Sequence, residues 1–519
     1  MKKFKHYDKD QLPMFPLDIS ELIDDNHLVR VINSFGDELS MELLSKPFEK
    51  VGKPPYHPRM MMKVLLYSYS TKLFSARKIE KALLQDVTYM WLTGRQTPDH
   101  NTINRFRSFY FKDILEEVFV ELLDFLHVNG YIKFETYFVD GTKIEANANK
   151  YSYVWRKNTE RYKKQLGEKV KQVLKEIEEI NAKEDQFYGD KSLEELGRNN
   201  NINSEKIKKA ADTLNKKLKD KGNSKTKKSL VSRVKKLKRA SDKLSEYEKQ
   251  LKTLHKRNSY SKTDTDATFM RMKNNDELRA GYNFQVSSEN QFVVNYSVSQ
   301  EAADTSAFPQ HLKKIEQRGK KYIPKNYVGD AGYGSEENYY YLEKIKSKSY
   351  LKYNTFSSEL KLNTKDIFSK DNMQYDEEHD CFICPADKKI KYVKDTITTT
   401  GRGFKSKTKV YECNDCHGCQ YIERCNKSKD EKIIKIRPQL EKYKQQAKNN
   451  LMSKKGVKLQ KKRGPEIESF FGDLKMNQGY RMLRLRGLIK AQLELGYHSI
   501  AYNLRKLHAI ELKMTPITS

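Results

Sequence analysis

Two aspartates and a later glutamate could together hold metal ions for phosphodiester chemistry. Asp140 follows the β-prone run 134–139, and Asp330 follows a similar run at 326–329. Carboxylate oxygens are the ligands that Mg²⁺ prefers. Two such ions about 4 Å apart activate an attacking oxygen and stabilise the leaving oxygen. Asp140 precedes Gly141, and an Asp-Gly pair is also an ordinary turn, so a structural role stays open.

The third acid is expected from the C-terminal helix, where Glu466 and Glu468 compete. Glu468 and Lys475 are seven residues apart, which leaves them about 20° from alignment on a helix. Glu466 and Lys475 are nine apart and lie on opposite faces. A metal-binding carboxylate with a lysine on the same face suits a phosphate substrate, so we favour Glu468. Arg463 is expected at the start of this helix, where it can grip phosphate with two N–H groups.

The overall charge points to a polyanionic partner. The chain has 519 residues, with 100 Lys+Arg against 69 Asp+Glu, and a net charge of +31. Such an excess argues against small neutral substrates and favours nucleic acid. The sequence contains no apolar run of about 18 residues, and its basic start lacks the apolar segment of a signal peptide. We therefore expect no membrane contact and a cytoplasmic location.

Residues 1–130 read as a helical domain, with a candidate DNA-binding element near its end. A Pro-Asp turn at 98–99 precedes a short helix, for which Asn101 or Thr102 could provide the cap. This helix is expected to expose Asn104, Arg105 and Arg107, which would suit a DNA groove. A plain helical bundle with a charged face is the alternative.

The order of the later elements predicts an α+β or α/β fold with a ribonuclease-H-like core. Residues 131–155 and 259–370 read as strand, strand, strand, helix, strand, helix, with a hairpin around the polar segment 287–291. Residues 428–519 are expected to supply the helices that complete this core. The acids would then lie at strand ends.

Residues 156–258 are expected to form an inserted, basic coiled-coil hairpin. Leu230, Leu237, Leu244 and Leu251 repeat every seven residues, which is the spacing of a coiled-coil seam. The segments 197–206 and 219–229 read as loops. A DNA-phosphate arm, a dimer contact and a solvated spacer all remain open.

All six cysteines lie between Cys381 and Cys425, within a cysteine-rich insertion at 371–427. Cys381 and Cys384 form one C-x₂-C pair, and Cys413 and Cys416 form another. Paired spacing of this kind is typical of a zinc ribbon, in which four thiolates hold Zn²⁺. Cys419 and Cys425 are two further thiols, so the ligand set stays open, and reduced cysteines in a small apolar core are the alternative.

Five sequence blocks resemble a bacterial insertion-sequence DDE transposase. They are YFVDGTKIEANANKY, TDTDATFM, GYNFQ, YVGDAGYGSEENY and RGPEIESFFGDLKMNQGYRMLRLRG, and they occur in family order. The nearest group is the insertion sequence 1182 family, related to the insertion sequence 4 and 5 groups. PDHNTINRFR resembles the helical domain that precedes the catalytic domain in these proteins. The resemblance covers most of the chain outside the coiled-coil insertion.

The resemblance implies a catalytic site, its cofactors and its partners. The family's acids fall on Asp140, Asp330 and Glu468, and its phosphate-binding residues on Lys475 and Arg463. Gln460 stands where relatives often carry Tyr, and the gap from Arg463 to Glu468 is one residue longer than is common. The implied activity is cleavage and strand transfer on double-stranded DNA, at transposon ends and target, with two Mg²⁺ ions or Mn²⁺ in their place. Joining two ends implies a homodimer on DNA. A nuclease without strand joining and a non-catalytic DNA-binding scaffold are the alternatives.

Overall fold

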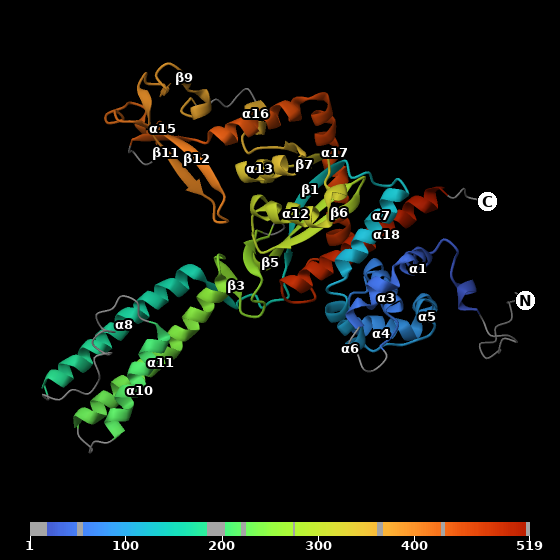
Figure 1. The fold of residues 1–519 in the computed structure, drawn as a ribbon, viewed down its shortest axis with the longest axis horizontal. Coiled ribbons are helices and arrows are strands. Elements are labelled where there is room, and N and C mark those ends of the chain that lie inside the picture. The colour runs from blue at the N-terminus through green and yellow to red at the C-terminus, as the bar shows by residue number, and fades with distance from the viewer. Residues whose placement is uncertain are drawn as a thin grey trace, which may run out of the picture. The chain divides into compact units, whose positions relative to one another are not determined.

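The computed structural model describes residues 18–48, 55–183, 203–219, 225–272, 276–360, 367–426 and 431–514. The chain forms two compact units, drawn as ribbons in Figure 1. Unit 1 combines Met1–Glu145 with Tyr282–Ser519, and unit 2 is Ala146–Gly281. Within the described ranges, no helix is both long enough and apolar enough to cross a membrane.

The first part of unit 1 is helical, as predicted. Every residue of α3 from Met60 to Ser70 is buried, because a helix that is apolar on all sides belongs in a core. Asp99 caps α6 by accepting the N–H of Thr102 at 2.6 Å, so the predicted caps Asn101 and Thr102 lie inside the helix. The elements are η1 (Ile19–Leu22), α1 (Leu28–Glu38), α2 (Met41–Ser45), η2 (Lys46–Phe48), α3 (Pro58–Ser70), α4 (Ala76–Gln85), α5 (Val87–Thr93), α6 (His100–Arg105), η3 (Phe106–Tyr110) and α7 (Leu115–Val128).

A mixed sheet follows these helices. Its strands β5, β1, β7 and β8 are neighbours in that order, and β6 pairs with β5. β1, β7 and β8 run parallel, while β5 and β6 form the predicted antiparallel hairpin. Asn290 and Gln291 make its tight turn, both with positive φ, as a two-residue hairpin requires. The bounds are β1 (Thr136–Glu145), β5 (Leu278–Glu289), β6 (Phe292–Ser299), β7 (Asn326–Gly329) and β8 (Lys348–Leu351).

Both ends of β1 are fixed by polar contacts with other parts of unit 1. The buried carboxylate of Glu289 accepts the backbone N–H groups of residues 133–136 at 2.7–3.1 Å. At the other end, Glu145 exchanges backbone hydrogen bonds with Arg481 and Leu483. This second contact prolongs the strand to Glu145, so the expectation that it ends at Asp140 is wrong.

Helices from the second half of unit 1 pack on the sheet. α12 and α18 contact β6, α16 contacts β8, and α17 contacts β1 and β7. α17 begins at Lys454, where the Ser453 side chain accepts the N–H of Gly456. Arg463 therefore lies inside the helix, and the expectation that it stands at the start is wrong. The elements are α12 (Asp304–Arg318), η4 (Lys320–Tyr322), η5 (Ala331–Tyr333), α13 (Glu336–Lys344), α14 (Phe356–Leu360), α16 (Pro438–Met452), α17 (Lys454–Gly472), η7 (Asp473–Asn477) and α18 (Leu488–Met514).

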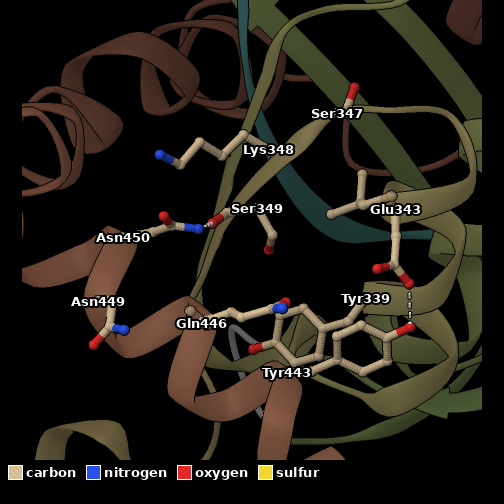
Figure 2. A pocket seen from close by; sticks show the side chains of 11 residues that line it. Tyr339, Glu343, Ser347, Lys348, Ser349, Tyr443, Gln446, Asn449 and Asn450 are labelled. Carbon is tan, nitrogen blue, oxygen red and sulfur yellow. Dashed lines mark hydrogen bonds between the residues drawn. The ribbon is translucent and has the colours of Figure 1, made fainter. Parts of the chain in front are cut away.

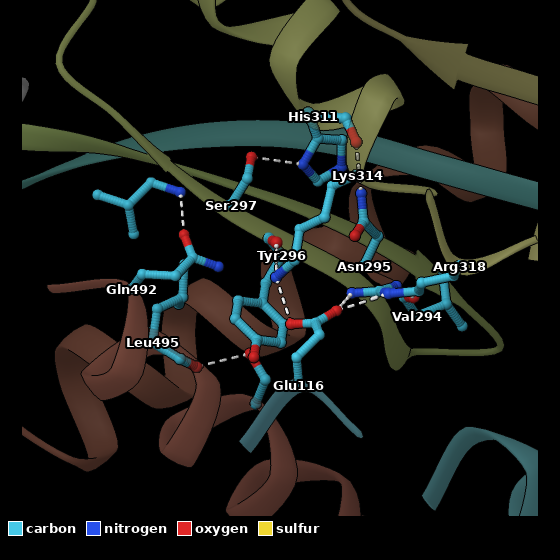
Figure 3. Close-up of polar contacts among 12 residues, drawn as sticks. Glu116, Val294, Asn295, Tyr296, Ser297, His311, Lys314, Arg318, Gln492 and Leu495 are labelled. Carbon is cyan, nitrogen blue, oxygen red and sulfur yellow. Dashed lines mark hydrogen bonds and ion pairs between the residues drawn. The ribbon is translucent and has the colours of Figure 1, made fainter. Parts of the chain in front are cut away.

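A cluster of charges joins α7 to α12 (Figure 3). Glu116 forms ion pairs with Lys314 at 2.6 Å and with Arg318 at 2.5 Å. The Arg318 side chain is 4% exposed and that of Glu116 is 34% exposed. Burial opposes the charge of Glu116, but the two cations overcome it and lower the pKa of Glu116 to about 2. The carboxylate is therefore a charged, fully engaged link between the two helices.

The cysteines belong to a separate five-stranded antiparallel sheet in unit 1. Its order is β13-β12-β11-β10-β9. One face carries a small apolar core of Met373, Phe382, Ile390, Tyr411 and Ile434, with Cys413 among them. The elements are η6 (Lys370–Asn372), β9 (Gln374–Asp376), β10 (Cys381–Ile383), β11 (Lys389–Thr399), β12 (Lys405–Cys413), α15 (Ile422–Cys425) and β13 (Lys432–Ile436).

Unit 2 is a helical arm closed by a short strand pair. The predicted seam leucines Leu230, Leu237 and Leu244 are buried in its core. Leu251 instead packs near the strand pair. The core also takes in α10, a helix that the sequence pattern did not predict and whose first residues were expected in a loop; residues 197–202 and 220–224 of the expected loops lie outside the described residues. The elements are β2 (Tyr153–Trp155), α8 (Arg156–Lys183), α10 (Ser204–Lys219), α11 (Lys225–Leu254), β3 (Ser259–Ser261) and β4 (Thr268–Arg271).

Candidate functional site

The parallel pairing of β1 with β7 sets the positions of Asp140 and Asp330. The paired residues are Thr136 with Asn326 and, at the far end, Phe138 with Val328. Extending this register by two residues sets Asp140 opposite Asp330, the residue that directly follows β7. Neighbouring strands lie about 4.8 Å apart. The two aspartates predicted from separate parts of the sequence are therefore neighbours, at the place where the central strand β7 ends beside β1.

A third aspartate, Asp304, borders the same place. A Cβ atom added at Gly141 would collide with the Asp304 carboxylate and with the Gln285 amide. A Cβ atom at Gly332 would lie 3.0 Å from Asp330 Oδ1 and 3.9 Å from Asp304 Oδ2. The two glycines thus leave room for the three carboxylates to approach one another.

Tyr333 and Gln285 are buried and form a series of hydrogen bonds that ends at the carboxylate of Asp304. The Tyr333 hydroxyl donates to Gln285 Oε1 at 2.6 Å, and Gln285 Nε2 donates to Asp304 Oδ1 at 2.7 Å. Burial, followed by the charges of Asp304, Asp140 and Asp330, raises the pKa of Tyr333 well above its ordinary value. Tyr333 therefore stays a neutral donor that holds Gln285, which in turn orients Asp304.

Asp304 lies in a block that is similar to the transposase family, and from the sequence we expected a turn or structural duty for it and no metal role. The hydrogen bonds that Gln285 and Asn283 make to it were not predicted. A signal was present, because Asn283 and Gln285 put two amides on one face of a strand, alternating with the apolar residues Tyr282, Phe284 and Val286. Asn283 Nδ2 also donates to Asp304 Oδ1, at 2.8 Å. Alternate polar residues in a fully buried strand need partners, and Asp304 is that partner.

α17 and η7 bring basic side chains to β1. Arg463 Nη1 lies 4.0 Å from Asp140 Oδ2. The Lys475 ammonium donates to Thr142 Oγ1, two residues along the strand from Asp140. Lys475 lies in the π-helical turn η7 rather than on α17, so the predicted alignment of Glu468 and Lys475 on one regular helix is wrong. Lys475 reaches the strand from the turn beyond the helix.

The two competing glutamates have different surroundings. Glu466 is buried, and its carboxylate accepts the N–H of Gln291 at 2.6 Å and pairs with Lys462 at 2.8 Å. Glu468 is exposed on the same helix, and its carboxylate lies near Gly464. Glu466 is thus committed to anchoring α17 at the β5–β6 turn, whereas Glu468 is accessible. Its assignment as the third acid stays a prediction.

The predicted DNA-contacting residues near α6 divide into two kinds. Arg105 is exposed and Asn104 is partly exposed. Arg107 is 4% exposed and donates to Phe74 O at 2.7 Å and Asn104 Oδ1 at 2.5 Å. The expectation that Arg107 is fully exposed is wrong, because its guanidinium ties η3 to the turn before α4.

Five cysteines gather at one cavity of about 20 Å³. They are Cys384, Cys413, Cys416, Cys419 and Cys425. Cys381, one of the four predicted zinc ligands, is buried on β10 and does not line this cavity. Burial raises the pKa of the Cys413 thiol to about 11 and also raises that of Cys425. The predicted set of four is therefore not the set that the fold brings together.

A further cavity, of about 340 Å³, lies between α13, β8 and α16 (Figure 2). The carboxylate in its wall, Glu343, accepts the Tyr443 hydroxyl at 2.6 Å. Asn450 donates to the backbone of Ser349 at 2.9 Å. These polar groups are used in holding α16 against the sheet, so we assign this cavity no chemistry.

Across the described ranges, no three His, Cys, Asp or Glu side chains stand close enough together to hold a metal ion. The donor set at the sheet edge nevertheless suits a hard divalent ion, since Asp140 and Asp330 offer carboxylate oxygens from adjacent strands. The predicted zinc set does not fit in the same way, because Cys381 stands apart from the other three.

The fold and the site define a mixed α/β protein with paired aspartates at one edge of a parallel strand pair. Comparison with protein families adds two matches: residues 17–109 match a transposase domain (DUF772), and residues 383–508 match a transposase DDE domain. No curated protein and no solved structure gives a significant match. The two family matches support a DDE transposase of the insertion-sequence kind, and hence an enzyme of DNA transposition. The second match contains Glu468 and Lys475, while Asp140 and Asp330 lie outside it.

Proposed function

We propose that this protein is a transposase of the insertion sequence 1182 family that binds terminal inverted repeats, cuts DNA at the element ends and joins the freed 3′-hydroxyls to target DNA. The observation that carries the proposal is the β1–β7 register, whose last pair is Phe138 with Val328 and which, continued by two residues, sets Asp140 opposite Asp330. Neither residue lies in the matched DDE segment, so the strand geometry supports the proposal independently of the family matches.

The order of the strands supports a ribonuclease-H-like core. β6, β5, β1, β7 and β8 follow one another across the sheet, with the last three parallel. α12 connects β6 to β7, and α13 connects β7 to β8. These are the connections of the strand and helix order predicted from the sequence. Asp140 lies on β1, and Asp330 directly follows the neighbouring parallel strand β7.

Asp140, Asp330 and Glu468 would hold two Mg²⁺ ions, or Mn²⁺ in their place. When bound, such ions activate the attacking oxygen and stabilise the leaving oxygen. Arg463 and Lys475 stand beside Asp140 and would hold the phosphate by charge-assisted hydrogen bonds. Asp304 is a positioning residue, because Gln285 and Tyr333 fix its carboxylate next to Gly141.

The direct test uses duplex DNA that carries the element's own flanking ends. We expect Mg²⁺-dependent nicking at the ends by the wild-type protein, and loss of nicking with DNA binding retained in Asp140→Ala. Joining of pre-cut ends to a target duplex separates a transposase from a nuclease. If Asp140→Ala changes nothing that can be measured, the protein is a DNA-binding scaffold and the proposal fails.

The remaining parts of the proposal concern assembly and location. Synapsis of two ends requires two copies of the active site, so we propose a homodimer on double-stranded DNA. The protein would act in the bacterial cytoplasm, at the nucleoid. Light scattering with and without paired-end DNA tests the assembly, and a single copy on each synapsed pair would contradict it.

Structural Zn²⁺ in the cysteine region is a separate part of the proposal. Across the described residues no three thiols stand close enough together to hold an ion, so zinc would have to draw together thiols from the small cavity. Those available there are Cys384, Cys413, Cys416, Cys419 and Cys425, and Cys381 is not among them. Cys416→Ser with Cys419→Ser should release zinc that elemental analysis finds in the wild type, and Cys381→Ser should retain it. Zinc-free wild-type protein of normal thermal stability would leave the cysteines as a reduced apolar core.

A further inference from the structure

A basic groove of about 770 Å³ lies in unit 1, away from the paired aspartates. Its walls come from the turn before α4 and the start of α4, from α6 with η3, and from the segment before α18 together with the first turn of α18. None of the residues that line it is an aspartate or a glutamate. Its cations are Lys72, Arg77, Lys78, Arg107, Arg484 and Lys490. A concave surface with this charge attracts anions and concentrates them locally.

The start of α4 adds backbone donors to the groove. Ala76, Arg77 and Lys78 are the first three residues of this ten-residue helix, and all three line the groove. The Ser75 side chain makes no capping hydrogen bond to them. The first N–H groups of a helix point along its axis and favour a negatively charged oxygen. The groove therefore combines cationic side chains with backbone donors.

Arg107 is a fixed member of one wall of the groove. Its side chain is buried, and two of its nitrogens donate to Phe74 O and Asn104 Oδ1. Its guanidinium also interacts with the hydroxyl of the buried Tyr69. These contacts with the protein interior hold the positive charge of Arg107 at the groove.

The opposite wall of the groove, which contains Arg484, is fixed by contacts with the protein interior. Glu494 is buried and accepts the backbone N–H of Arg484 at 2.9 Å and the hydroxyl of Tyr480. The Tyr480 ring in turn lies edge-on to Phe74, with centroids 5.4 Å apart. Both walls rest on this shared aromatic core, so the spacing of the cations across the groove is set before any ligand arrives.

We infer that this groove binds the phosphate backbone of duplex DNA, next to the transposon end that is being processed. The inference rests on the proposed function and deepens it by naming a surface for the DNA. The charge of the groove fits the regular phosphates of a duplex, which such contacts position without reading base sequence. Its wall at 484–490 directly follows η7, which carries Lys475. A backbone held here is thus tied to the element that faces Asp140.

The test compares two double variants of equal charge change. Arg77→Gln with Lys78→Gln removes two cations from the groove, and Lys313→Gln with Lys320→Gln removes two exposed cations that do not line it. Binding of a duplex containing the element's end is measured over a salt series without divalent metal. We expect the groove variant to bind at least tenfold more weakly near physiological salt and to lose about two from the slope of log K against log salt. The control pair should keep most of both values.

Phosphate-ethylation interference gives the location of the contact. Wild-type protein should show blocked phosphates at a fixed distance from the end, and the groove variant should lose that block. Lys490→Gln, on the opposite wall, should relieve the same or adjacent phosphates. Arg77→Lys with Lys78→Arg should restore binding, which excludes misfolding as the cause of the loss.

Three outcomes are distinguishable. Equal affinity and an equal salt slope for the groove variant and the wild type, in a protein that still cleaves its ends, would overturn the groove and leave the proposed function intact. Loss of RNA binding with unchanged duplex binding would also overturn it. A wild-type protein that neither binds nor cuts duplex DNA would instead overturn the proposed function on which the groove depends.

Discussion

Two clusters of charged side chains in unit 1 have opposite designs. At Glu116 one carboxylate serves two cations, Lys314 and Arg318, within 2.6 Å. At the sheet edge Asp140, Asp304 and Asp330 surround Tyr333, and a described cation, Arg463, lies 4.0 Å from one of them. The first cluster is satisfied within the protein and holds two helices together. The second concentrates negative charge, which is what a site for external cations requires.

The largest expected effect tests whether the second cluster is catalytic. Asp330→Asn should lower end cleavage by at least a thousandfold, or about 4 kcal/mol in activation free energy, because an amide is a poor ligand for Mg²⁺. The melting temperature should stay close to that of the wild type, since removing one of several neighbouring negative charges relieves repulsion. Single-turnover cleavage and calorimetry measure the two quantities. Cleavage within tenfold of wild type would remove Asp330 from the site.

The second-largest expected effect is a loss of stability with normal DNA cleavage. Glu116→Gln leaves two largely buried cations without their counter-charge, and removing one partner of a buried ion pair costs about 3–5 kcal/mol. Because the Glu116 side chain is 34% exposed, we expect a loss of about 2 kcal/mol in the free energy of unfolding, after discounting for solvent screening. Urea denaturation measures this loss. The folded variant should cleave DNA normally. A catalytic defect without a stability loss would contradict the structural role that we assign to the Glu116 cluster.

Acid titration sharpens the same contrast. The pKa of Glu116 is about 2 in the folded protein, against an ordinary value of 4.5 for an unperturbed glutamate, so its carboxylate stabilises the fold above pH 4.5. That stabilisation should be lost as the pH falls from about 4.5 towards 2, because the unfolded chain takes up the proton first. Urea unfolding at several pH values should show this slope in the wild type. Glu116→Gln is the control, and it should lack this part of the slope.

The smallest effect concerns the support beneath the aspartates. Tyr333→Phe removes the donor to Gln285 Oε1 and leaves that acceptor buried, which should cost about 1 kcal/mol in stability. Because Gln285 positions Asp304, cleavage should fall by about fivefold rather than vanish. Tyr339→Phe is the matched control, because it removes another buried tyrosine hydroxyl that does not belong to the Tyr333–Gln285–Asp304 hydrogen bonds. Equal cleavage by the two variants would show that these hydrogen bonds do not influence the site.

The sequence predicted elements better than it predicted where they end. The run before Asp140 was correctly predicted as a strand because Tyr137, Phe138 and Val139 form an apolar run typical of strands buried on both faces. Its continuation to Glu145 depends on Arg481 and Leu483, more than three hundred residues away, which no local pattern could reveal. The start of α17 was misplaced for a related reason, since its polar first turns carry no apolar periodicity.

The candidate site was predictable only in part. Asp140 and Asp330 could be found from their positions after apolar runs, whereas Asp304, the first residue of α12, follows no strand and was expected to have a turn or structural duty. Arg107 was expected to face DNA because arginine is usually exposed, but Phe74 and Asn104 draw it inward. The cysteine set was left open because spacing gives only pairs, while the fold decides which thiols lie at the same cavity, and Cys381 on β10 does not.

The carboxylate of Glu289 fixes where β1 begins. It accepts the backbone N–H groups of residues 133–136, and Asp140 lies six residues beyond Phe134. The position of Asp140 along the sheet therefore depends on the number of residues between the two. Deleting or inserting a single residue between them would turn the Asp140 side chain to the opposite face of the sheet, because side chains alternate along a strand. Variation in length should therefore be absent from this short stretch in active copies of the element, even where its apolar residues are exchanged freely.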